Sequence, residues 1–580
     1  MEFWLIILLS LSACFSTLFT LLFFSKTTKN NEFPPGPLSL PIIGHLHLLP
    51  KSTIELRSLL SNLSQKYGPI ITLLVGSKPL VFITSYPIAH QALVKNSIIF
   101  ANRPSVVPVS YILSNKRKDI GGSPYGLTWR VLRRNLMSEA LHPSGLKSYS
   151  FARKRSMETL VNSFKQCSKQ EGEAVRLFEH LHWAVFSLFI HMTYGDIGED
   201  AIREVEHIQY TFLVSYAEFS VFASWPRLGK LVYRKRWQRY TQFLRRQYDI
   251  LMPHIRARQK LKQEKGAKEV ELVTYTDTLL DLEISEGAGK LEEADVLSLS
   301  SEFINAGADT TATMFHWVMA YLVKHPHIQA KLFAQISRVV EQGTKEVKEE
   351  DLQRIPYLKA VILECLRIHP PNTSLVPHTN TEDMELCGYT IPKNTTVLIG
   401  TAIIGRDPTV WENPMEFRPE RMMSRSGNDD GGEEVGDVSS FKMLPFGAGR
   451  RMCPGYKYGS LILEYFVANL VWNFEWKAVD DVDLSEKEEF LVVMKNPVLS
   501  EFGLLSAPCK SEDCEARDIG QDRRYGLPRA LLHFVKLPFN GGDPDKLLKQ
   551  TLNAENVVTY MGQTSRNLPG EIIVLKQKNS

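Results

Sequence analysis

The sequence predicts a mainly α-helical protein with small β-sheets, preceded by a single N-terminal transmembrane helix. Most of the chain carries apolar residues at helical spacing, two short β-rich runs lie near its beginning, and its first residues are almost all apolar. The longest helical stretches are 146–168, 201–222, 234–262 and 294–324.

The composition narrows the class of function. The 580 residues are 44% hydrophobic and 23% charged, as in an ordinary globular protein, and the net charge of +4 is too small to indicate a nucleic-acid partner. The sequence shows no basic tail and no internal repeat. Its length fits several average domains, but it also fits one large catalytic unit.

The first element is apolar. No charge occurs from Phe3 to Ser25, and this run is long enough to cross a bilayer core of about 30 Å, so we expect a membrane anchor over residues 3–25. A cleaved signal peptide is the alternative, although such peptides begin with positive charge and only Glu2 precedes this run. Two lysines follow the run, which places the rest of the chain in the cytosol by the positive-inside rule.

Residues 26–37 form a proline-rich hinge or a plain linker, because Pro34, Pro35 and Pro37 stiffen the chain and cannot continue a helix. Beyond it, the β-rich runs in 70–84 flank a turn and predict a hairpin.

Two later stretches are irregular. Residues 427–437 are rich in glycine and acidic residues, which predicts a solvated loop. Residues 508–580 are strongly charged at first and then hold isolated apolar runs without a continuing period. We expect an atypical tail of unknown role here, either the product of read-through or of an erroneous gene model, or a functional module.

Cys453 has the most informative surroundings. Gly449 and Gly455 let the backbone turn tightly and approach a bulky group, Pro454 fixes the exit, and Arg451 supplies positive charge beside a thiolate. This pattern indicates a metal ligand, and thiolate ligation of haem iron favours cleavage of dioxygen. An inert buried thiol is the alternative. The seven cysteines include no CxxC pair, which argues against zinc.

The helix predicted at 294–324 carries a second candidate site. Ala306 and Thr310 share one face, and Gly307 removes a side chain where a ligand could approach the backbone. Asp309 supplies a carboxylate and Thr310 a hydroxyl, a pair able to relay protons to dioxygen. A helix C-cap or a weak point is the alternative, because Gly, Thr and Asp are poor helix formers.

Two further helical motifs carry charge. Glu364 and Arg367 meet on one face of an otherwise apolar helix, so at least part of this pair is expected to be buried, with further partners; an exposed salt bridge is the alternative. Trp129 and Arg133 share a face one turn apart, and Arg130 and Arg134 lie on the neighbouring face.

Together these motifs resemble those of cytochromes P450, over about residues 33–500. Phe446, Gly449, Arg451, Cys453 and Gly455 stand at the fixed positions of that family's haem-binding loop. The resemblance implies the cytochrome P450 fold for residues 38–500, haem b as cofactor, and Cys453 as the axial ligand of the haem iron.

The resemblance also implies roles for the other motifs. Asp309 and Thr310 are the expected catalytic residues. The remaining expected residues hold the haem or the core around it: Trp129, Arg133, Arg451 and His378 as donors to the haem propionates, and Arg421 as the partner of Glu364 and Arg367 in a structural core. His378 is the weakest of these assignments, since many relatives carry Arg there.

Residues 128–136 and 301–307 look most like plant microsomal A-type families eighty-nine and seventy-seven. The resemblance implies a monooxygenase of the endoplasmic reticulum membrane, single-pass and with its catalytic domain in the cytosol, that inserts one atom of O2 into a substrate. A haem-thiolate isomerase or dehydratase and a non-catalytic haem-binding membrane protein are the alternatives.

The implied partners are NADPH-cytochrome P450 reductase, membrane lipid and a hydrophobic small-molecule substrate. NADPH is used indirectly, because the chain has no flavin or nicotinamide motif. Arg130, Arg134 and Lys442 are expected to face outward, either toward an acidic electron donor or as an ordinary solvated surface. The apolar run 212–222, followed by a basic cluster, is expected near lipid or in the core. Family members line the substrate pocket with segments matching 105–109, Phe303, Ala306 and 372–375.

Overall fold

The computed structural model describes residues 33–50, 52–105, 118–167, 175–224, 226–265, 272–284, 290–425 and 433–504, with short pieces at 4, 10, 12–17, 533–538 and 571–576. The chain divides into two units, Met1–Pro508 and Cys509–Ser580. Most of the expected anchor 3–25, the first part of the hinge and most of the tail 508–580 lie outside the described residues. Among the residues that are described, no helix is both long and apolar enough to cross a membrane.

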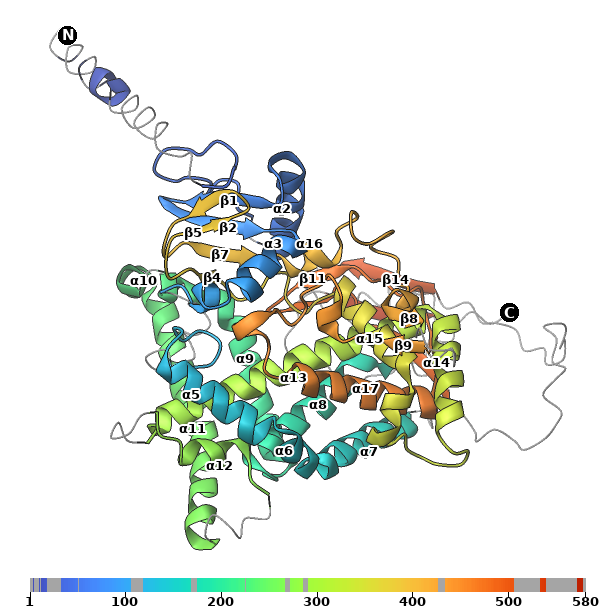
Figure 1. Ribbon diagram of the computed structural model, residues 1–580. Coiled ribbons are helices and arrows are strands. Elements are labelled where there is room, and N and C mark those ends of the chain that lie inside the picture. The colour runs from blue at the N-terminus through green and yellow to red at the C-terminus, as the bar shows by residue number, and fades with distance from the viewer. Residues whose placement is uncertain are drawn as a thin grey trace. The chain divides into compact units, whose positions relative to one another are not determined.

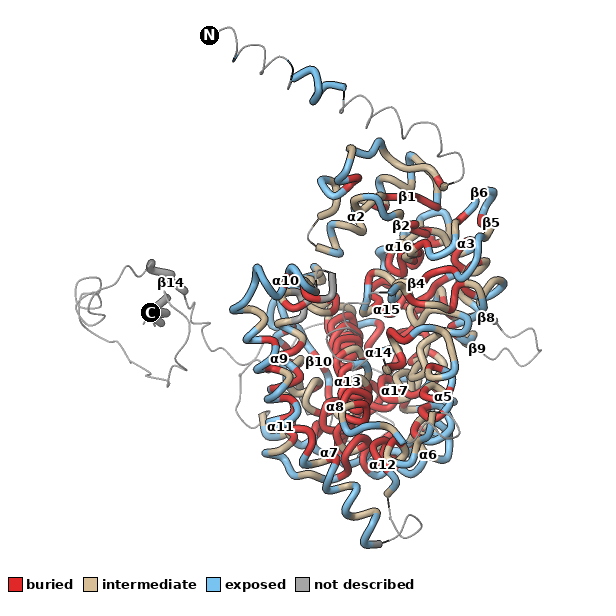
Figure 2. The backbone as a smooth tube through the Cα atoms, turned by 90° about the vertical axis from the view of Figure 1, so that its left-hand side faces the viewer, coloured by how far each residue is buried: buried red, intermediate tan, exposed pale blue. Residues whose placement is uncertain are grey.

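The first unit is built around helix α13 (Glu293–Lys324), which is buried along most of its length and runs through the middle of Figure 2. Its sequence is apolar on almost every side, as expected of a fully buried helix. Asp295 closes a capping box with Glu292 at its start. Helix α8 (Leu177–Tyr194), α15 (Pro356–Ile368) and α17 (Tyr456–Asn473) pack against it.

The other helices surround this centre (Figure 1). The predicted helices at 201–222 and 234–262 are confirmed as α9 and α11. The stretch predicted as one helix at 146–168 is two, because the backbone leaves the helical conformation at Tyr149, where φ is −91° and ψ is 6°. The α-helices are α2 (Thr53–Tyr67), α3 (Tyr86–His90), α5 (Leu127–Asn135), α6 (Pro143–Ser148), α7 (Ser150–Cys167), α9 (Glu199–Ser224), α10 (Pro226–Val232), α11 (Arg234–Lys265), α12 (Tyr275–Leu280), α14 (Pro326–Val339) and α16 (Thr401–Gly405). Short π or 3-10 turns occupy Gln91–Lys95, Ile99–Ala101, Leu136–Ala140, Glu349–Arg354, Pro419–Met422, Val438–Ser440 and Gly449–Arg451.

The largest sheet has the order β1-β2-β7-β4. Its strands are β1 (Ile70–Val75), β2 (Lys78–Ile83), β7 (Thr396–Ile399) and β4 (His378–Thr379). The predicted hairpin is confirmed, since β1 pairs with β2 up to Val75 opposite Lys78, and Gly76 takes a φ of 61° in the turn. Strand β7 joins β2 in parallel, which brings distant parts of the chain together.

The smaller sheets lie at the edges of the helical body. One contains β10 (Phe474–Ala478), β13 (Leu499–Leu504) and β3 (Val175–Arg176), and hairpins pair β5 (Met384–Leu386) with β6 (Tyr389–Ile391), β8 (Met423–Arg425) with β9 (Glu433–Val435), and β11 (Glu486–Glu488) with β12 (Val492–Met494). The prediction of a loop throughout 427–437 is wrong at 433–435, because this stretch pairs with β8 and Val435 packs on the core. In the second unit, β14 (His533–Pro538) pairs with β15 (Glu571–Lys576).

The end of the hinge segment packs on the sheet. The Thr72 backbone N–H donates to the Pro35 carbonyl at 3.0 Å, and a Cβ on Gly36 would lie 2.1 Å from the Thr72 carbonyl oxygen. Glycine is therefore required at position 36, because any side chain would push the segment off β1.

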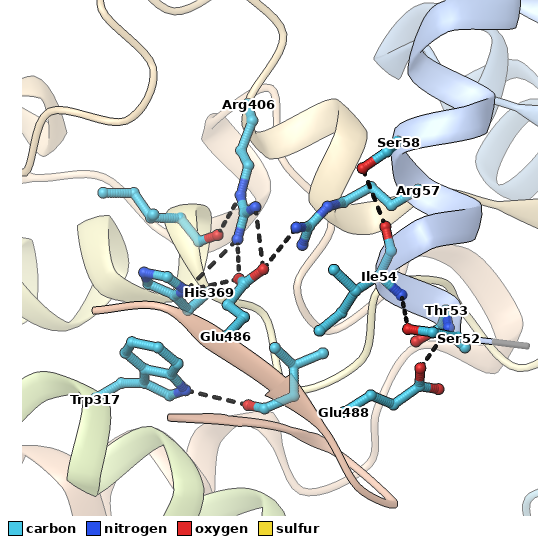
Figure 3. Close-up of polar contacts among 12 residues, drawn as sticks. Ser52, Thr53, Ile54, Arg57, Ser58, Trp317, His369, Arg406, Glu486 and Glu488 are labelled. Atoms are coloured by element: carbon cyan, nitrogen blue, oxygen red, sulfur yellow. Dashed lines mark hydrogen bonds and ion pairs between the residues drawn. The ribbon is translucent and has the colours of Figure 1, made fainter. Parts of the chain in front are cut away.

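A buried ionic network joins the sheet region to the helical core (Figure 3). The Glu486 carboxylate binds Arg406 of the loop after α16, Arg57 of α2 at 2.6 Å, and the Nδ1–H of His369 at 2.8 Å. The His369 ring stacks on Trp317 of α13 at 3.8 Å, and its Nε2 accepts from the Tyr321 hydroxyl at 2.8 Å. One carboxylate thus holds four elements together.

Removing this carboxylate should destabilise the protein. Burial by itself would raise the pKa of Glu486, but the hydrogen bond from His369 and the charge of Arg406 outweigh burial and hold that pKa well below its usual range. The stabilisation is therefore present above a pH of about 4.5 and is lost as the pH falls further. We expect Glu486→Gln to cost about 3 kcal/mol at neutral pH, because it leaves two half-buried arginines without their carboxylate partner.

Chemical denaturation at pH 7 and at a series of pH values well below 4.5 measures this effect. The control is Glu488→Gln in the same strand, whose carboxylate accepts from the exposed Thr53 backbone N–H. Equal unfolding free energies for the two variants would show that the network contributes no stability.

Candidate active site

The loop around Cys453 is held in a narrow turn. The Cys453 backbone N–H donates to the Phe446 carbonyl at 2.9 Å, and Gly449 has a φ of 69°. A Cβ on Gly449 would lie 1.8 Å from the Leu93 carbonyl oxygen. A side chain there would therefore force the Cys453 loop away from the segment Gln91–Lys95. The glycine that the sequence singled out is thus required by both conformation and space.

Cys453 lies just before α17, whose N-cap is Gly455. Burial raises the pKa of the Cys453 thiol, while the Gly455 backbone N–H and the charge of Arg133 act in the opposite direction. The start of a helix and a guanidinium both favour negative charge on sulfur. These surroundings would stabilise a thiolate once a metal replaces the proton.

One face of α13 is open to solvent, although most of the helix is buried. Ala306 is exposed and Glu302 and Thr310 are half-buried, although Ile304, Ala308 and Ala312 of the same helix are completely buried. The three solvent-reached residues follow one another at intervals of one turn. The helix therefore leaves one side open in the middle of the protein.

Gly307 serves a different purpose from the one predicted. A Cβ at this position would lie 2.0 Å from the Phe189 ring of α8, so the missing side chain admits a neighbouring helix rather than a ligand. Phe303 likewise packs in the core, with its ring 5.5 Å from Phe189 and 4.7 Å from Tyr275. Of the predicted lining residues on this helix, the structure places Ala306 on the open side.

Three arginines gather between α5 and the Cys453 loop. Arg133 donates to the Met452 carbonyl at 2.6 Å, which ties α5 directly to the residue before Cys453. Arg451 donates to the carbonyls of Ala101 and Ser123, both at 2.7 Å, and its guanidinium lies 4.4 Å from the centre of the Trp129 ring. The Trp129 indole N–H donates to the Ile120 carbonyl at 3.2 Å.

Arg103 is the third arginine, and the sequence analysis missed it. Its guanidinium is buried and donates to the carbonyls of Gly121 at 2.9 Å and Val376 at 2.8 Å. Burial and the like charge of Arg451 lower the pKa of Arg103 to about 9. An isolated Arg beside the apolar run Ile98–Ala101 was the available signal, because a buried charge needs a reason.

The acidic groups nearby do not balance these charges. Burial and the neighbouring charge of Asp119 hold the pKa of Glu302 well above its ordinary value, although its carboxyl accepts backbone N–H groups from Ile120 and Gly121 at 2.9 and 2.7 Å. Three guanidinium groups thus lie near only two carboxyl groups, those of Glu302 and Asp119. This excess of positive charge suits an anionic ligand.

His378 is close to this cluster but offers it no N–H. Its Nδ1 donates to the Phe100 carbonyl at 2.7 Å, and burial and the charge of Arg103 hold its pKa well below the usual range. The neutral ring then presents only a lone pair at Nε2.

Asp309 and Thr310 point to different surroundings. The Thr310 hydroxyl donates to the Ala306 carbonyl at 2.7 Å and lies on the open face of α13. The Asp309 carboxylate is buried, and its Oδ1 lies 3.0 Å from Nε2 of His182 in α8. In the described part of the chain, Oδ2 of Asp309 has no hydrogen-bond partner.

The expected core triad comes together. Arg367 donates to both oxygens of Glu364 at 2.8 Å, and both side chains are fully buried. Arg421 adds a bond to Glu364 at 3.2 Å, and Arg367 also donates to the Gly405 carbonyl at 2.7 Å. The alternative of an exposed salt bridge is wrong, because the apolar side chains around α15 exclude water from the pair.

Comparison with known proteins agrees with this site. The family description "Cytochrome P450" matches residues 34–502. The chain belongs to the cytochrome P450 family. It is 42% identical to cytochrome P450 89A9 of Arabidopsis thaliana over 506 residues, or 85% of this chain and 97% of that protein. It is 31% identical to a costunolide synthase of Cichorium intybus over 460 residues, or 78% of this chain and 87% of that protein.

Solved structures share the fold. A zebra fish cytochrome P450 with progesterone superposes with a TM-score of 0.65, at 24% identity, covering 78% of this chain and 99% of the other. The family match and the plant relatives together identify the protein as a plant A-type cytochrome P450 related to family eighty-nine, and as a haem-thiolate monooxygenase.

The residues present fit a haem group. The thiol of Cys453 is a suitable iron ligand, α13 leaves one face open, and the excess of guanidinium groups suits two propionates. The helix α13 passes near the first turn of α17, since a Cβ on Gly459 would lie 3.8 Å from the Thr311 hydroxyl. The open face of α13 and the Cys453 loop are therefore parts of one region.

We predict that Gly449→Ala lowers the haem content of the purified enzyme, because its Cβ would overlap the Leu93 carbonyl. Gly343→Ala is the control: Gly343 also has a positive φ, of 89°, but nothing lies within 4 Å of its added Cβ. We expect the control to lose only about 1 kcal/mol of stability and to keep its haem. The haem-to-protein ratio measures the difference, and equal ratios would contradict this account of the loop.

Proposed function

We propose that the enzyme inserts one atom of O2 into a hydrophobic small-molecule substrate, with electrons from NADPH delivered by a separate NADPH-cytochrome P450 reductase. The observation that carries this proposal is the open face of α13, on which Ala306 and Thr310 lie in the same region as the Cys453 loop. Ala306 on that face is small and apolar, which suits an apolar substrate.

The proposed roles of the side chains follow from their positions. Cys453 would hold the haem iron through its sulfur, and Trp129, Arg133, Arg451 and the newly found Arg103 would bind the propionates after giving up bonds to backbone carbonyls. A haem with a thiolate ligand supplies the reduction and cleavage of dioxygen. His378 fits the propionate set poorly, because it lacks a free N–H.

The remaining assignments concern support and proton supply. Phe446 and Gly455 shape the Cys453 loop, and the triad of Glu364, Arg367 and Arg421 supports it from the core. Asp309 would hold a proton at its carboxylate and Thr310 would pass one at its hydroxyl oxygen.

The reductase would dock on the basic surface beside the Cys453 loop. Arg130, Arg134, Lys442 and Arg450 are exposed there. Tyr125 joins two of them, since Arg130 lies 5.4 Å from the centre of its ring and Arg450 donates to its hydroxyl at 3.0 Å. A basic surface favours an acidic electron donor.

We further propose that residues 3–25 anchor the enzyme in the endoplasmic reticulum membrane as a single span, that 26–37 form a hinge, and that 38–500 form the cytosolic haem domain. The uncharged apolar run from Phe3 to Ser25 supports the anchor. Exposed apolar residues on α10, namely Leu228, Leu231 and Val232, lie beside basic residues and suit contact with lipid. Residues 508–580 keep no assigned role.

Spectroscopy of the reduced, carbon monoxide-bound protein tests the central assignment. We expect the red-shifted Soret band of thiolate-ligated haem in the wild type, and its loss in Cys453→Ala, because no other sulfur is proposed to reach the iron. Cys365→Ala is a suitable control, since that cysteine is buried in α15. A band typical of an imidazole ligand in the wild type would overturn the assignment.

Replacing Thr310 by Ala tests the oxygen chemistry. We expect a severalfold larger share of the NADPH electrons to emerge as hydrogen peroxide, because the hydroxyl that passes protons is gone. Thr311→Ala is the matched control, since Thr311 is buried against α17. An enzyme that rearranges a peroxide without a reductase would respond to neither change, so an unaffected Thr310→Ala variant would favour an isomerase or dehydratase.

A further inference from the structure

Three side chains from three helices form an unbroken hydrogen-bonded row. Asp309 of α13 meets Nε2 of His182 in α8 at 3.0 Å, and Nδ1 of the same ring meets the Glu206 carboxylate of α9 at 2.9 Å. His182 is 127 positions from Asp309, so the row exists only because α8 packs against both α13 and α9.

The row leads from the interior to the surface. The Asp309 side chain is 11% exposed, His182 is 15% exposed and Glu206 is 26% exposed. At the inner end, Oδ2 of Asp309 is buried without a hydrogen-bond partner among the described residues. A buried carboxylate oxygen without a donor is costly, so this atom has the features of a group that exchanges a proton.

Apolar rings isolate the imidazole from other charges. Phe178 and Phe186 lie one turn before and one turn after His182 in α8, each with its ring centre 5.6 Å away. The charged groups that act on His182 are Asp309 on α13 and Glu206 on α9. Burial by itself would lower the pKa of His182, but the hydrogen bonds and charges of these two carboxylates raise it to about 9.

We propose that His182 and Glu206 form a proton relay that supplies Asp309 from solvent at the surface of α9. This inference rests on the proposed monooxygenase function, in which each inserted oxygen atom requires protons. His182 and Glu206 act through Asp309 and are positioning residues for proton supply.

The path of the proton follows from the donor atoms. His182 gives its Nε2 proton to Oδ1 of Asp309. Rotation of the Asp309 carboxyl group then carries this proton to the place that Oδ2 occupied. The neutral imidazole then flips, so that Nε2, which has lost its proton, faces Glu206. The Glu206 carboxylate takes a proton from water and gives it to this nitrogen. The charge of the row is the same after one cycle as before it, because one proton enters at Glu206 and one leaves at Asp309.

A purely structural role is the competing explanation, since one ion pair also holds α8 to α13 and the other holds α8 to α9. A structural pair would affect stability alone. A relay would also change how electrons divide between water and peroxide, and how that division responds to deuterated solvent.

The test uses the full-length, haem-loaded enzyme with reductase and NADPH, and it needs no known substrate. In His182→Gln and Glu206→Gln, we expect a severalfold rise in the hydrogen peroxide released per O2 consumed, and a larger solvent deuterium effect on NADPH oxidation. His180→Gln is the matched control: His180 lies on the same helix, but it bonds to Ser163 at 3.2 Å instead of a carboxylate.

The carbon monoxide band separates the possible failures. Wild-type peroxide release in both variants, with an intact red-shifted band, would overturn the relay and leave the monooxygenase standing. Absence of the band from the wild type would overturn the proposed function itself. If His182→Gln does not fold, Glu206→Gln decides the matter, because its carboxylate is the most exposed of the three.

The pH dependence of thermal unfolding gives an independent readout. Because the folded-state pKa of His182 is raised to about 9, its contribution to stability is present below its ordinary value of 6.5 and is lost as the pH rises through about 9. We expect this loss in the wild type and in His180→Gln, and we expect it to disappear in His182→Gln. An unchanged pH profile in His182→Gln would show that the imidazole is not charged in the row, which would also overturn the relay.

Discussion

Helix α13 has to be buried on nearly all sides and yet stay open on one, and the rest of the structure is arranged around this requirement. The buried sides need close neighbours, which α8, α15 and α17 supply, and Gly307 lets the Phe189 ring approach the backbone. The open side needs small or polar residues, and Ala306 and Thr310 provide them. A cavity can exist in a dense protein only where the surrounding helices are held apart by their own packing.

Charge placement follows from the same arrangement. The region between α5 and the Cys453 loop gathers Arg103, Arg133 and Arg451, whose guanidinium groups are satisfied largely by backbone carbonyls rather than by carboxylates. Carbonyl partners solvate a buried cation without cancelling its charge. The core triad around Glu364 shows the opposite solution: Glu364 pairs with both Arg367 and Arg421, and Arg421 also pairs with Glu416, so two carboxylates balance two arginines. The two clusters therefore differ in function because they differ in their acceptors.

Much of this could be predicted from the sequence where the chemistry lies within a few residues. The Cys453 loop, the pair of Glu364 and Arg367, and the β1-β2 hairpin are local patterns with local causes. Contacts between helices were missed, because helical spacing tells which residues share a face but not what that face meets. Two such contacts are the bond between His182 and Asp309, which are 127 positions apart, and the packing of Phe303 on Phe189 and Tyr275.

The proposed electron and proton entries lie on different elements. Exposed arginines on α5 and beside Cys453 would receive the reductase, whereas Glu206 on α9 would take protons from water. A basic docking surface would repel protons and lower the pKa of any acid placed on it, so a proton entry works better among carboxylates, which stabilise an imidazolium instead. The packing of α8 between α9 and α13 is what makes that second entry possible, because its imidazole reaches a carboxylate on each side.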